Sequence, residues 1–394
     1  MYLKRLRHKY KLKLIKLIMG LMPGVSYLAF AGEGSSAQMC RHIASTGVKR
    51  VLVVTDKALV ELGIADKAIE GLTGAGLEVF VFDEVLPDPT YKIVADGLAV
   101  LKANNCDAVL SVGGGSSIDA GKIMAACATN DSDPKEWAGF GKFAEDALPI
   151  FAIPTTSGTG SEATMGAVIS DSTTHEKGII SGRSLLPGAA ALDPSLMTGL
   201  PGPITAATGM DAMTHGIEAY ICQWHGRGTS ATFAMSAVTG VFANLRTAYT
   251  DGSNVQVRAA MALAAYQAGV AINQVNVGNV HAIAHQLGGK YGIPHGLANA
   301  MVLPHVLEFC KEQCADKLAE LAVAAGVGSS ANEFISAVKT LNHDVGIPEK
   351  VAQLQAADIS HLVELALIEG AGYASPLLMG EADCAAILNN LLPA

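Results

Sequence analysis

Three histidines fall within one short stretch of this chain, "VHAIAHQLGGKYGIPHG", at residues 280–296. They are His281, His285 and His295. Histidine is the commonest metal ligand among side chains, and its charge changes near neutral pH. The stretch therefore indicates a metal site, a proton-transfer site, or both.

A second stretch offers a carboxylate and a further imidazole. In "GMDAMTHGIEAY" (209–220), Asp211 and His215 lie four residues apart, so a helix would place them on one face. Alone, this pair also fits a surface pair or a helix N-terminus. Combined with the later histidines it supplies imidazoles and a carboxylate, which suit Fe²⁺ or Zn²⁺ better than Mg²⁺ or Ca²⁺.

Local spacing leaves the choice among the three later histidines open. His281 and His285 are four residues apart, so spacing favours them as a chelating pair. His295 lies beyond Pro294 and beyond Gly288-Gly289, where we expect a helix to stop. Local geometry ranks His295 last, at the start of another element.

A glycine loop in "VLSVGGGSSIDAGKIMA" (109–125) joins a predicted strand to a predicted helix. Glycines allow a phosphate to approach the backbone, and the helix N-terminus supplies unpaired N–H groups. Ser116 and Ser117 are expected to cap this helix. The alternative is a tight strand-to-helix turn without a ligand.

Two further polar segments follow strand-like runs. Asp56 comes directly after 50–54 and could accept hydrogen bonds from the adenosine ribose of NAD, where it would repel the 2′-phosphate of NADP. A helix N-cap is the equal alternative for Asp56. The loop "PTTSGTGSE" (154–162) suits cofactor contacts, although such residues often only form turns.

The elements that must position these residues change character near residue 200. The first half alternates strand and helix, which predicts a parallel sheet with helices on both faces and ligands at the carboxyl ends of its strands. Strands are predicted at 50–54, 78–82, 108–112, 150–154, 166–170 and 188–193, with helices near 57–75 and 91–104.

The second half contains no convincing strand after "GLPGP" (199–203) and is rich in alanine, which favours helices. We therefore expect two domains, residues 1–200 and 201–394. Helices are predicted at roughly 204–222, 229–249, 255–288, 296–310, 313–325, 331–344 and 358–369.

Composition excludes several classes of protein. Half of the 394 residues are hydrophobic and 16% are charged, which argues against disorder. A net charge of −9 argues against a general nucleic-acid binder. The seven scattered cysteines do not resemble a disulfide framework, so a reducing cytoplasm is the expected setting.

Residues 1–27 form a basic N-terminal extension, with seven Lys or Arg among residues 1–16. The apolar run that follows is interrupted by Gly20, Pro23 and Gly24. We expect a basic amphipathic helix on or beside the first domain, with contact to a membrane surface as the weaker alternative. A membrane-spanning helix is not expected.

These motifs together resemble the iron-dependent (group III) alcohol dehydrogenase family. The matching stretches span about residues 28–310 and include "GGGSSIDAGK", "IPTTSGTGSE", "ATGMDAMTHGIEAY" and "VHAIAHQLGGKYGIPHGLANAMVLPHV". The resemblance implies a dehydroquinate synthase-like fold, with an α/β dinucleotide-binding domain and an all-helical metal-binding domain. It also implies that the metal lies in the cleft between them.

The resemblance gives each site residue a role. It implies that Asp211, His215, His281 and His295 hold the metal and that His285 helps to move the proton. Asp56 matches the position linked to NAD preference. The other cofactor-side matches are Gly114, Gly115, Ser116, Asp119, Thr155, Thr156, Thr159 and Lys177.

The implied activity is hydride transfer between an alcohol, or an aldehyde in reverse, and NAD(H). Fe²⁺ would act as the Lewis acid, with Zn²⁺ as the alternative and NADP the less expected cofactor. A cytoplasmic homodimer is the default expectation. Two departures from the family pattern bear on the substrate: Asp88 replaces an asparagine in "PDPT", and residues 370–380 lack the usual Asn-Pro-Arg.

Three other functions are compatible with parts of this pattern. A zinc polyol dehydrogenase and a dehydroquinate synthase-like lyase would share the fold, but the third late histidine disfavours both. A non-catalytic assembly protein would need no metal-binding residues, so the complete set of metal-binding residues disfavours this function.

Overall fold

The structure is a computed structural model that describes residues 10, 12, 24–173, 177–224 and 228–393. Within it the chain forms two compact units. The α/β unit comprises Val25–Leu200 with Gly252–Gly269, and the helical unit comprises Pro201–Asp251 with Val270–Ala394. The predicted division into domains at residue 200 stays a prediction.

The amphipathic helix predicted for the N-terminal extension cannot be compared with the structure. It falls on residues 1–9, 11 and 13–23, which lie outside the described residues.

A six-stranded parallel sheet forms the centre of the α/β unit, in the order β1-β9-β6-β4-β2-β3. Strands β4, β6 and β9 are buried along their whole length, which explains their almost continuous apolar sequences. The strands are β1 (Ala29–Ala31), β2 (Arg50–Val54), β3 (Glu78–Phe82), β4 (Ala108–Gly113), β6 (Ile150–Pro154) and β9 (Ala189–Leu192).

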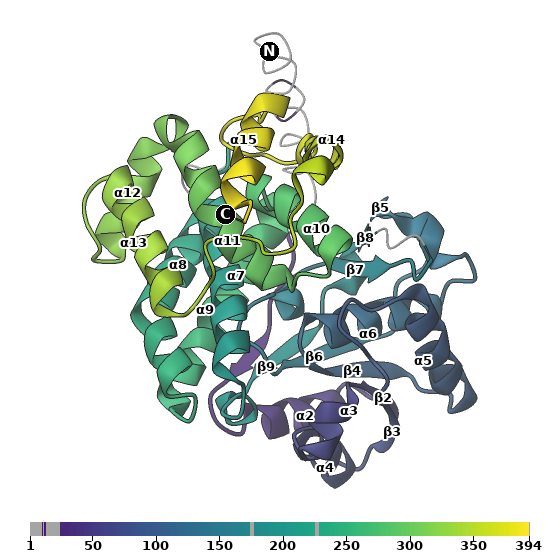
Figure 1. The fold of residues 1–394 in the computed structure, drawn as a ribbon. Helices are drawn as coiled ribbons and strands as arrows, with labels where there is room; N and C mark the ends of the chain where they lie inside the picture. The colour runs from purple at the N-terminus through teal and green to yellow at the C-terminus, as the bar shows by residue number, and fades with distance from the viewer. Residues whose placement is uncertain (1–9, 11, 13–23, 174–176, 225–227, 394) are drawn as a thin grey trace. The chain divides into compact units, whose positions relative to one another are not determined.

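Helices cover both faces of this sheet, as predicted. Helices α5 (Tyr91–Ala103) and α6 (Gly115–Cys127) pack together on one face (Figure 1). Helices α2 (Ser35–Ser45) and α4 (Asp66–Gly74) pack together on the other. The crossovers of a parallel sheet produce this layered arrangement.

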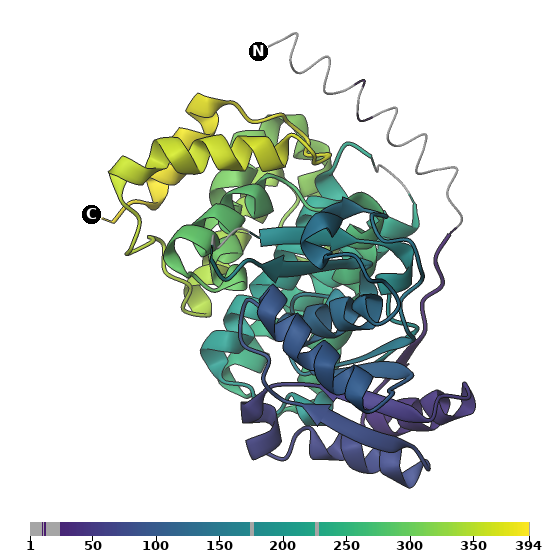
Figure 2. The same cartoon turned by 90° about the vertical axis from the view of Figure 1, so that its right-hand side faces the viewer.

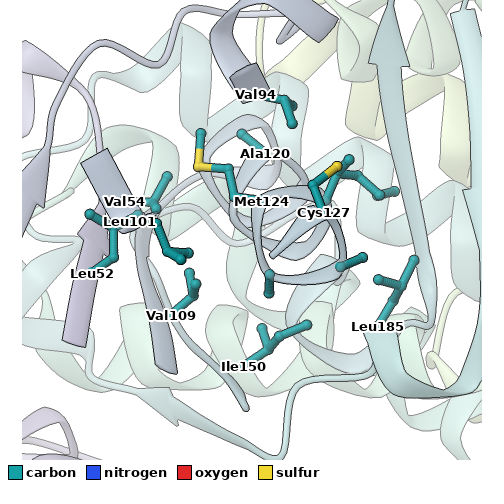
Figure 3. Packing of buried hydrophobic residues seen from close by; sticks show 14 of the residues in the cluster. Leu52, Val54, Val94, Leu101, Val109, Ala120, Met124, Cys127, Ile150 and Leu185 are labelled. Carbon is teal, nitrogen blue, oxygen red and sulfur yellow. The ribbon is translucent and has the colours of Figure 1, made fainter. Parts of the chain in front are cut away.

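Helix α6 is held to the sheet by a buried apolar cluster (Figure 3). Ala120 and Met124 of α6 belong to the same cluster as Leu52 of β2 and Val109 of β4. Because almost every residue of α6 after its first turn is buried, the helix cannot shift without breaking this packing. The glycine loop that precedes α6 is therefore carried by a rigid element.

The prediction that 166–170 joins the parallel sheet is wrong. This segment is β7 (Gly166–Ser170), which pairs antiparallel with β8 (Lys177–Ser181) in a separate small sheet that also contains β5 (Gly139–Phe140). The burial of β7 alternates in its first half, as in a half-exposed antiparallel strand. An apolar run this short does not reveal which sheet it will join.

Two predicted helices are each divided in the structure. The segment 57–75 forms α3 (Lys57–Glu61) and α4, with Gly63 between them at φ 68°. The segment 255–288 forms α9 (Val255–Val275) and α10 (Asn279–Tyr291), with Asn276 between them at φ 66°. A left-handed residue ends an α-helix, and glycine and asparagine adopt that conformation most readily.

The helical unit contains no strand among its described residues, as predicted. Helix α7 packs on α8 and α11, and α10 packs on α11 and α14; Figure 2 shows α14 and α15 in yellow beside the green helices. Besides α10, the helices are α7 (Gly202–Ile221), α8 (Thr229–Thr250), α11 (His295–Cys310), α12 (Ala315–Ala324), α13 (Ala331–Asp344), α14 (Ile359–Gly370) and α15 (Glu381–Leu391).

Among the described residues, one helix is long and apolar enough to cross a membrane by length and composition alone. It is α9, and 56% of its most apolar window is buried inside the protein. A core helix shows the same combination, so α9 is weak evidence for membrane insertion.

Candidate metal centre

Helix α7 carries three ionisable side chains on one buried face. Asp211, His215 and Glu218 follow one another at spacings of four and three residues, which keep side chains on the same side of a helix. Each is at most 5% exposed. Burial of three such groups is costly unless they are paired or bind an ion, so this face indicates a site.

Two other helices bring the later histidines to this face. His281 lies in the first turn of α10, and His295 is the first residue of α11. The helix stop predicted at Gly288-Gly289 is wrong, because α10 continues to Tyr291 and ends at Gly292 in the left-handed conformation. His295 is therefore presented by a helix start.

A close approach between α11 and α7 fixes the position of His295. A Cβ atom at Gly296 would lie 2.3 Å from the carbonyl oxygen of Ala207 and 3.2 Å from Cβ of Asp211. Only glycine fits there without moving the backbone of α7. The residue after His295 thus allows the start of α11 to rest directly on the helix that carries Asp211.

The four predicted metal ligands come together. One donor atom from each of Asp211, His215, His281 and His295 lies within 4.8 Å of the others. From Oδ1 of Asp211, the Nε2 atoms lie at 3.9 Å for His215, 3.8 Å for His281 and 3.5 Å for His295. Nε2 of His215 and Nε2 of His281 are only 2.9 Å apart.

Glu218 determines which nitrogen of His281 faces this cluster. Its carboxylate accepts a 2.6 Å hydrogen bond from Nδ1 of His281 and bonds from the backbone N–H groups of Gly278 and Val280, at 2.9 Å and 2.7 Å. With its hydrogen on Nδ1, His281 presents the lone pair of Nε2 to the other three predicted ligands.

Burial keeps His281 in the neutral form that binds a metal. It lowers the pKa of His281 well below the usual value, and the neighbouring His215, His295 and His285 lower it further. Burial raises the pKa of Glu218, and its hydrogen bonds from Val280, Gly278 and His281 oppose that rise. A neutral imidazole is the form that binds a metal.

Asn299 lies against the same donor atoms. Its Nδ2 is 2.8 Å from Oδ1 of Asp211 and 3.1 Å from Nε2 of both His281 and His295. Oδ1 of Asn299 is buried without a hydrogen-bond partner among the described residues. The Asn299 amide group has two N–H hydrogens but faces three acceptor atoms, so at least one acceptor lacks a hydrogen from it. This excess of lone pairs favours a positive charge between the acceptor atoms.

The residues present fit a divalent transition metal. Lone pairs converge from three imidazoles and one carboxylate, and two imidazole nitrogens at 2.9 Å would repel each other without a hydrogen or a cation between them. A mixed nitrogen and oxygen set of this kind suits Fe²⁺ or Zn²⁺. The donor chemistry therefore supports a metal site on this face of the helical unit.

His285 lies beside this cluster but has another partner. Its ring centroid is 5.7 Å from that of His281 and 5.1 Å from that of His295. Its Nδ1 bonds to Oε1 of Glu369, at 2.5 Å. The spacing of four between His281 and His285 therefore does not make them a pair at this set of donor atoms.

The cofactor-side residues lie in the α/β unit, around the carboxyl ends of adjacent strands. Strands β2, β4 and β6 are neighbours and lead into Asp56, the glycine loop and the loop at 155–159. The N–H of Thr155 donates to the carbonyl of Gly113, at 2.9 Å. This edge of a parallel sheet is the usual ligand-binding position.

The glycine loop touches the threonine loop, which is the segment 154–162 that contains Thr155, Thr156 and Thr159. A Cβ atom at Gly115 would lie 2.7 Å from the side chain of Thr159, and one at Gly114 would lie 3.5 Å from that of Thr156. The prediction that Ser116 and Ser117 cap α6 is wrong, because Gly114 is the N-cap and both serines lie inside the first turn. The N–H groups of that turn have no side-chain cap.

The remaining cofactor-side residues also have protein partners. Asp56 is the N-cap of α3, and its Oδ1 accepts from the N–H of Leu59 at 3.0 Å. Asp119 accepts from Oγ of Ser161 and, through Oδ2, from the N–H of Val168 at 2.8 Å. Asp119 thus ties α6 to the threonine loop and to β7.

Lys177 forms an ion pair with Asp88, the residue that replaces the asparagine usual in the family. Its Nζ lies 2.7 Å from Oδ1 of Asp88, which has a left-handed backbone at φ 54°. Asparagine adopts that conformation more readily than most residues, and aspartate follows it closely. The structure thus joins two positions that the sequence singled out separately.

Sequence reasoning missed Glu218, Asn299 and Glu369. The sequence could have indicated Glu218, because it lies three residues after His215 and so on the same helix face. Asn299 is four residues after His295, and that spacing also pointed to a shared face. No sequence pattern indicated Glu369, because it lies 84 residues from its partner His285.

Known proteins resemble this chain along nearly its whole length. Residues 29–194 match the family described as "Iron-containing alcohol dehydrogenase". Residues 205–392 match "Fe-containing alcohol dehydrogenase family, C-terminal".

Several relatives are similar over most of their own length. The 1,3-propanediol dehydrogenase of Klebsiella pneumoniae is 39% identical and matches 93% of this chain and 97% of its own. The NAD-dependent methanol dehydrogenase of Bacillus methanolicus is 35% identical, over 92% of this chain and 97% of its own. The lactaldehyde reductase of Escherichia coli is 33% identical, over 86% and 91%.

The fold is shared with solved structures. A 1,3-propanediol oxidoreductase superimposes with a TM-score of 0.89 at 38% identity, over 94% of this chain and all of that one. The two family matches, the relatives and the fold agree with the donor set on α7, α10 and α11. The chain belongs to the iron-containing alcohol dehydrogenase family.

Proposed function

We propose that this protein is a metal-dependent dehydrogenase that transfers hydride between an alcohol and NAD⁺, or from NADH to an aldehyde or ketone. The observation that carries the proposal is the convergence of donor atoms from Asp211, His215, His281 and His295 within 4.8 Å. Family membership supports the reaction class.

The proposed metal is Fe²⁺, with Zn²⁺ as the alternative, because the donor set suits both ions. A bound divalent ion would supply Lewis-acid polarisation of the alcohol oxygen. The side chains of Asp211, His215, His281 and His295 would hold the ion, and Glu218 would keep the Nε2 lone pair of His281 available to it.

His285 is the proposed proton carrier. It lies beside the donor cluster without being one of its four members, so it is available to accept the proton of the alcohol O–H group. The hydrogen bond of its Nδ1 to Glu369 supports transfer through Nε2.

The proposed cofactor is NAD, held by the carboxyl edge of the parallel sheet. Gly114, Gly115 and Ser116 would bind its phosphates at the start of α6, where N–H groups lack a side-chain cap. The remaining proposed contacts are Asp56 to the ribose, with Thr155, Thr156, Thr159 and Lys177 around the cofactor. Asp119 would act by fixing the threonine loop.

The proposed substrate class is a small primary alcohol and its aldehyde. Relatives named for 1,3-propanediol, methanol and lactaldehyde support small substrates. A long-chain-alcohol dehydrogenase of Geobacillus thermodenitrificans, 35% identical over 82% of this chain, makes longer alcohols the necessary comparison.

Assembly and location are also proposals. The free edge strands β1 and β3 of the six-stranded sheet support a homodimer that pairs an edge. All seven cysteines are buried and none forms a disulfide among the described residues, which supports a reducing compartment such as the cytoplasm.

Chelation of the metal, followed by reconstitution, tests the proposed dehydrogenase activity directly. Chelated protein should not oxidise NADH with any aldehyde, and anaerobic Fe²⁺ or added Zn²⁺ should restore the reaction, because the ion polarises the substrate oxygen. The measurement is NADH absorbance with a series of aldehydes of increasing chain length. A protein that binds the metal yet oxidises no NADH with the whole series would contradict the proposal.

Single histidine substitutions separate metal binding from proton transfer. His281→Ala and His295→Ala should each lose metal and activity together, since each removes a ligand. His285→Ala should retain the metal and lose turnover by roughly 10²–10⁴-fold, the usual contribution of a general acid or base. Metal content by mass spectrometry is the readout. Loss of metal in His285→Ala with retention in His295→Ala would reverse the assignment.

Replacement of Asp56 tests the choice of NAD over NADP. Asp56→Asn keeps the cap of α3, because asparagine is as good an N-cap, but removes the charge that would repel a 2′-phosphate. The ratio of kcat/KM for NAD over that for NADP should fall about tenfold, or about 1.4 kcal/mol. Asp66→Asn, an exposed substitution in the first turn of α4, is the control. Equal use of both cofactors by the unmodified protein would refute the role of Asp56.

A further inference from the structure

The carboxylate of Glu369, in α14, accepts hydrogen bonds from three side chains. Oε1 accepts from Nδ1 of His285 at 2.5 Å and from the hydroxyl of Tyr373 at 2.6 Å. Oε2 accepts from Nε2 of Gln286 at 2.7 Å. A surface carboxylate on a helix does not ordinarily collect three donors, so Glu369 is part of a built arrangement.

These bonds fix Glu369 in its ionised form. A carboxylate that accepts several N–H or O–H groups loses them as acceptors when it is protonated. Burial raises the pKa of Glu369, but the hydrogen bond and electrostatic attraction of His285, with the hydrogen bonds from Tyr373 and Gln286, outweigh burial and lower that pKa. Burial and the neighbouring carboxylate raise the pKa of Tyr373, so its hydroxyl keeps its proton and donates.

An ionised Glu369 decides the tautomer of His285. A carboxylate accepts but cannot donate, so Nδ1 of His285 must carry the hydrogen of the 2.5 Å bond. Nε2 is then the nitrogen with the lone pair. The ring stacks on that of His295, with centroids 5.1 Å apart and planes 25° apart, which places His285 against the donor cluster.

The backbone holds the three partners of Glu369 in place. His285 and Gln286 are consecutive residues of α10, and Gln286 also donates to the carbonyl of Ala282 on its own helix, at 3.1 Å. Helices α10 and α14 pack against each other, and Tyr373 lies one turn after Glu369. The ring of His285 therefore cannot turn about its side-chain bonds without breaking the bond to Glu369.

We propose that Glu369 is a positioning residue for proton transfer, which fixes His285 as the Nδ1–H tautomer and turns its Nε2 lone pair toward the reacting alcohol. This inference rests on the proposed function. The alcohol proton passes to Nε2, the hydride passes from carbon to NAD⁺, and the carbonyl product forms from the remaining electron pair. Nδ1–H stays bonded to Glu369, whose negative charge stabilises the imidazolium.

The segment 370–380, which departs from the family pattern, supplies one of the donors to Glu369. Tyr373 lies in "GAGYASPLLMG" (370–380), where the usual Asn-Pro-Arg is missing. Its hydroxyl shares Oε1 of Glu369 with His285. The departing segment thus supports the carboxylate that orients the proposed proton carrier.

Nitrogen-15 NMR of protein with labelled histidine and Zn²⁺ in the metal site reads the tautomer without any turnover. The signals of His285 are those among the 11 histidines that disappear in His285→Ala. The unmodified protein should show a protonated Nδ1 and an unprotonated Nε2. Glu369→Ala should shift His285 to the Nε2–H tautomer, which free imidazole side chains prefer. An unchanged tautomer in Glu369→Ala would overturn the proposal.

Kinetics tests the consequence for turnover. Glu369→Ala should lower kcat roughly ten- to a hundredfold, less than loss of His285 itself, with metal content and both KM values unchanged. Added formate should restore part of this loss, because it can occupy the vacated carboxylate position. Glu364→Gln, an exposed substitution on the same helix, is the matched control and should change nothing.

Different failures are distinguishable. If the unmodified metal-loaded protein has no dehydrogenase activity, the proposed function fails while the NMR result still tests Glu369. If Glu369→Ala loses metal along with activity, or turns over as fast as Glu364→Gln, the positioning role is refuted. Should Glu369→Ala not fold, Glu369→Met keeps most of the side-chain volume without a carboxylate or amide acceptor and carries the same tests, without formate rescue.

Discussion

One buried carboxylate connects the parts of the metal centre. Glu218 of α7 accepts the N–H groups of Gly278 and Val280 at the start of α10, and it accepts Nδ1 of His281 in the same turn. A negative charge there is favoured by the helix dipole, which offsets part of the cost of burial. The same contact therefore joins two helices, caps one of them and sets the tautomer of His281, a proposed metal ligand.

The other contacts of the site follow a similar pattern, in which a histidine of one helix is held in place by a contact with a neighbouring helix. Gly296 lets α11 rest on α7 and so brings His295 to Asp211. Glu369 does for His285 what Glu218 does for His281. Two histidines four residues apart on one helix thus have separate carboxylate partners, and these partners, more than the spacing, support the proposed roles of His281 as a metal ligand and His285 as a proton carrier.

Much of the fold and of the site could be predicted from local patterns. Buried strands such as β2 and β6 appear as short apolar runs, and the stretches around Asp211 and His281 carry enough matching residues to indicate the family. The failures depend on information that is not local. Asn276 breaks a predicted helix through its backbone conformation, β7 pairs with β8 in a separate sheet, and Glu369 meets His285 only through packing of α14 on α10.

We propose that Asp211, His215, His281 and His295 bind one divalent metal while His285 remains unliganded. A crystal structure of protein loaded anaerobically with Fe²⁺, with anomalous diffraction recorded on both sides of the iron absorption edge, tests it most directly. We expect one anomalous peak within about 2.0–2.2 Å of the Asp211 carboxylate and of Nε2 of each of the three histidines. A peak bonded to His285, or a site in which His281 turns Nδ1 toward the ion and away from Glu218, would contradict it.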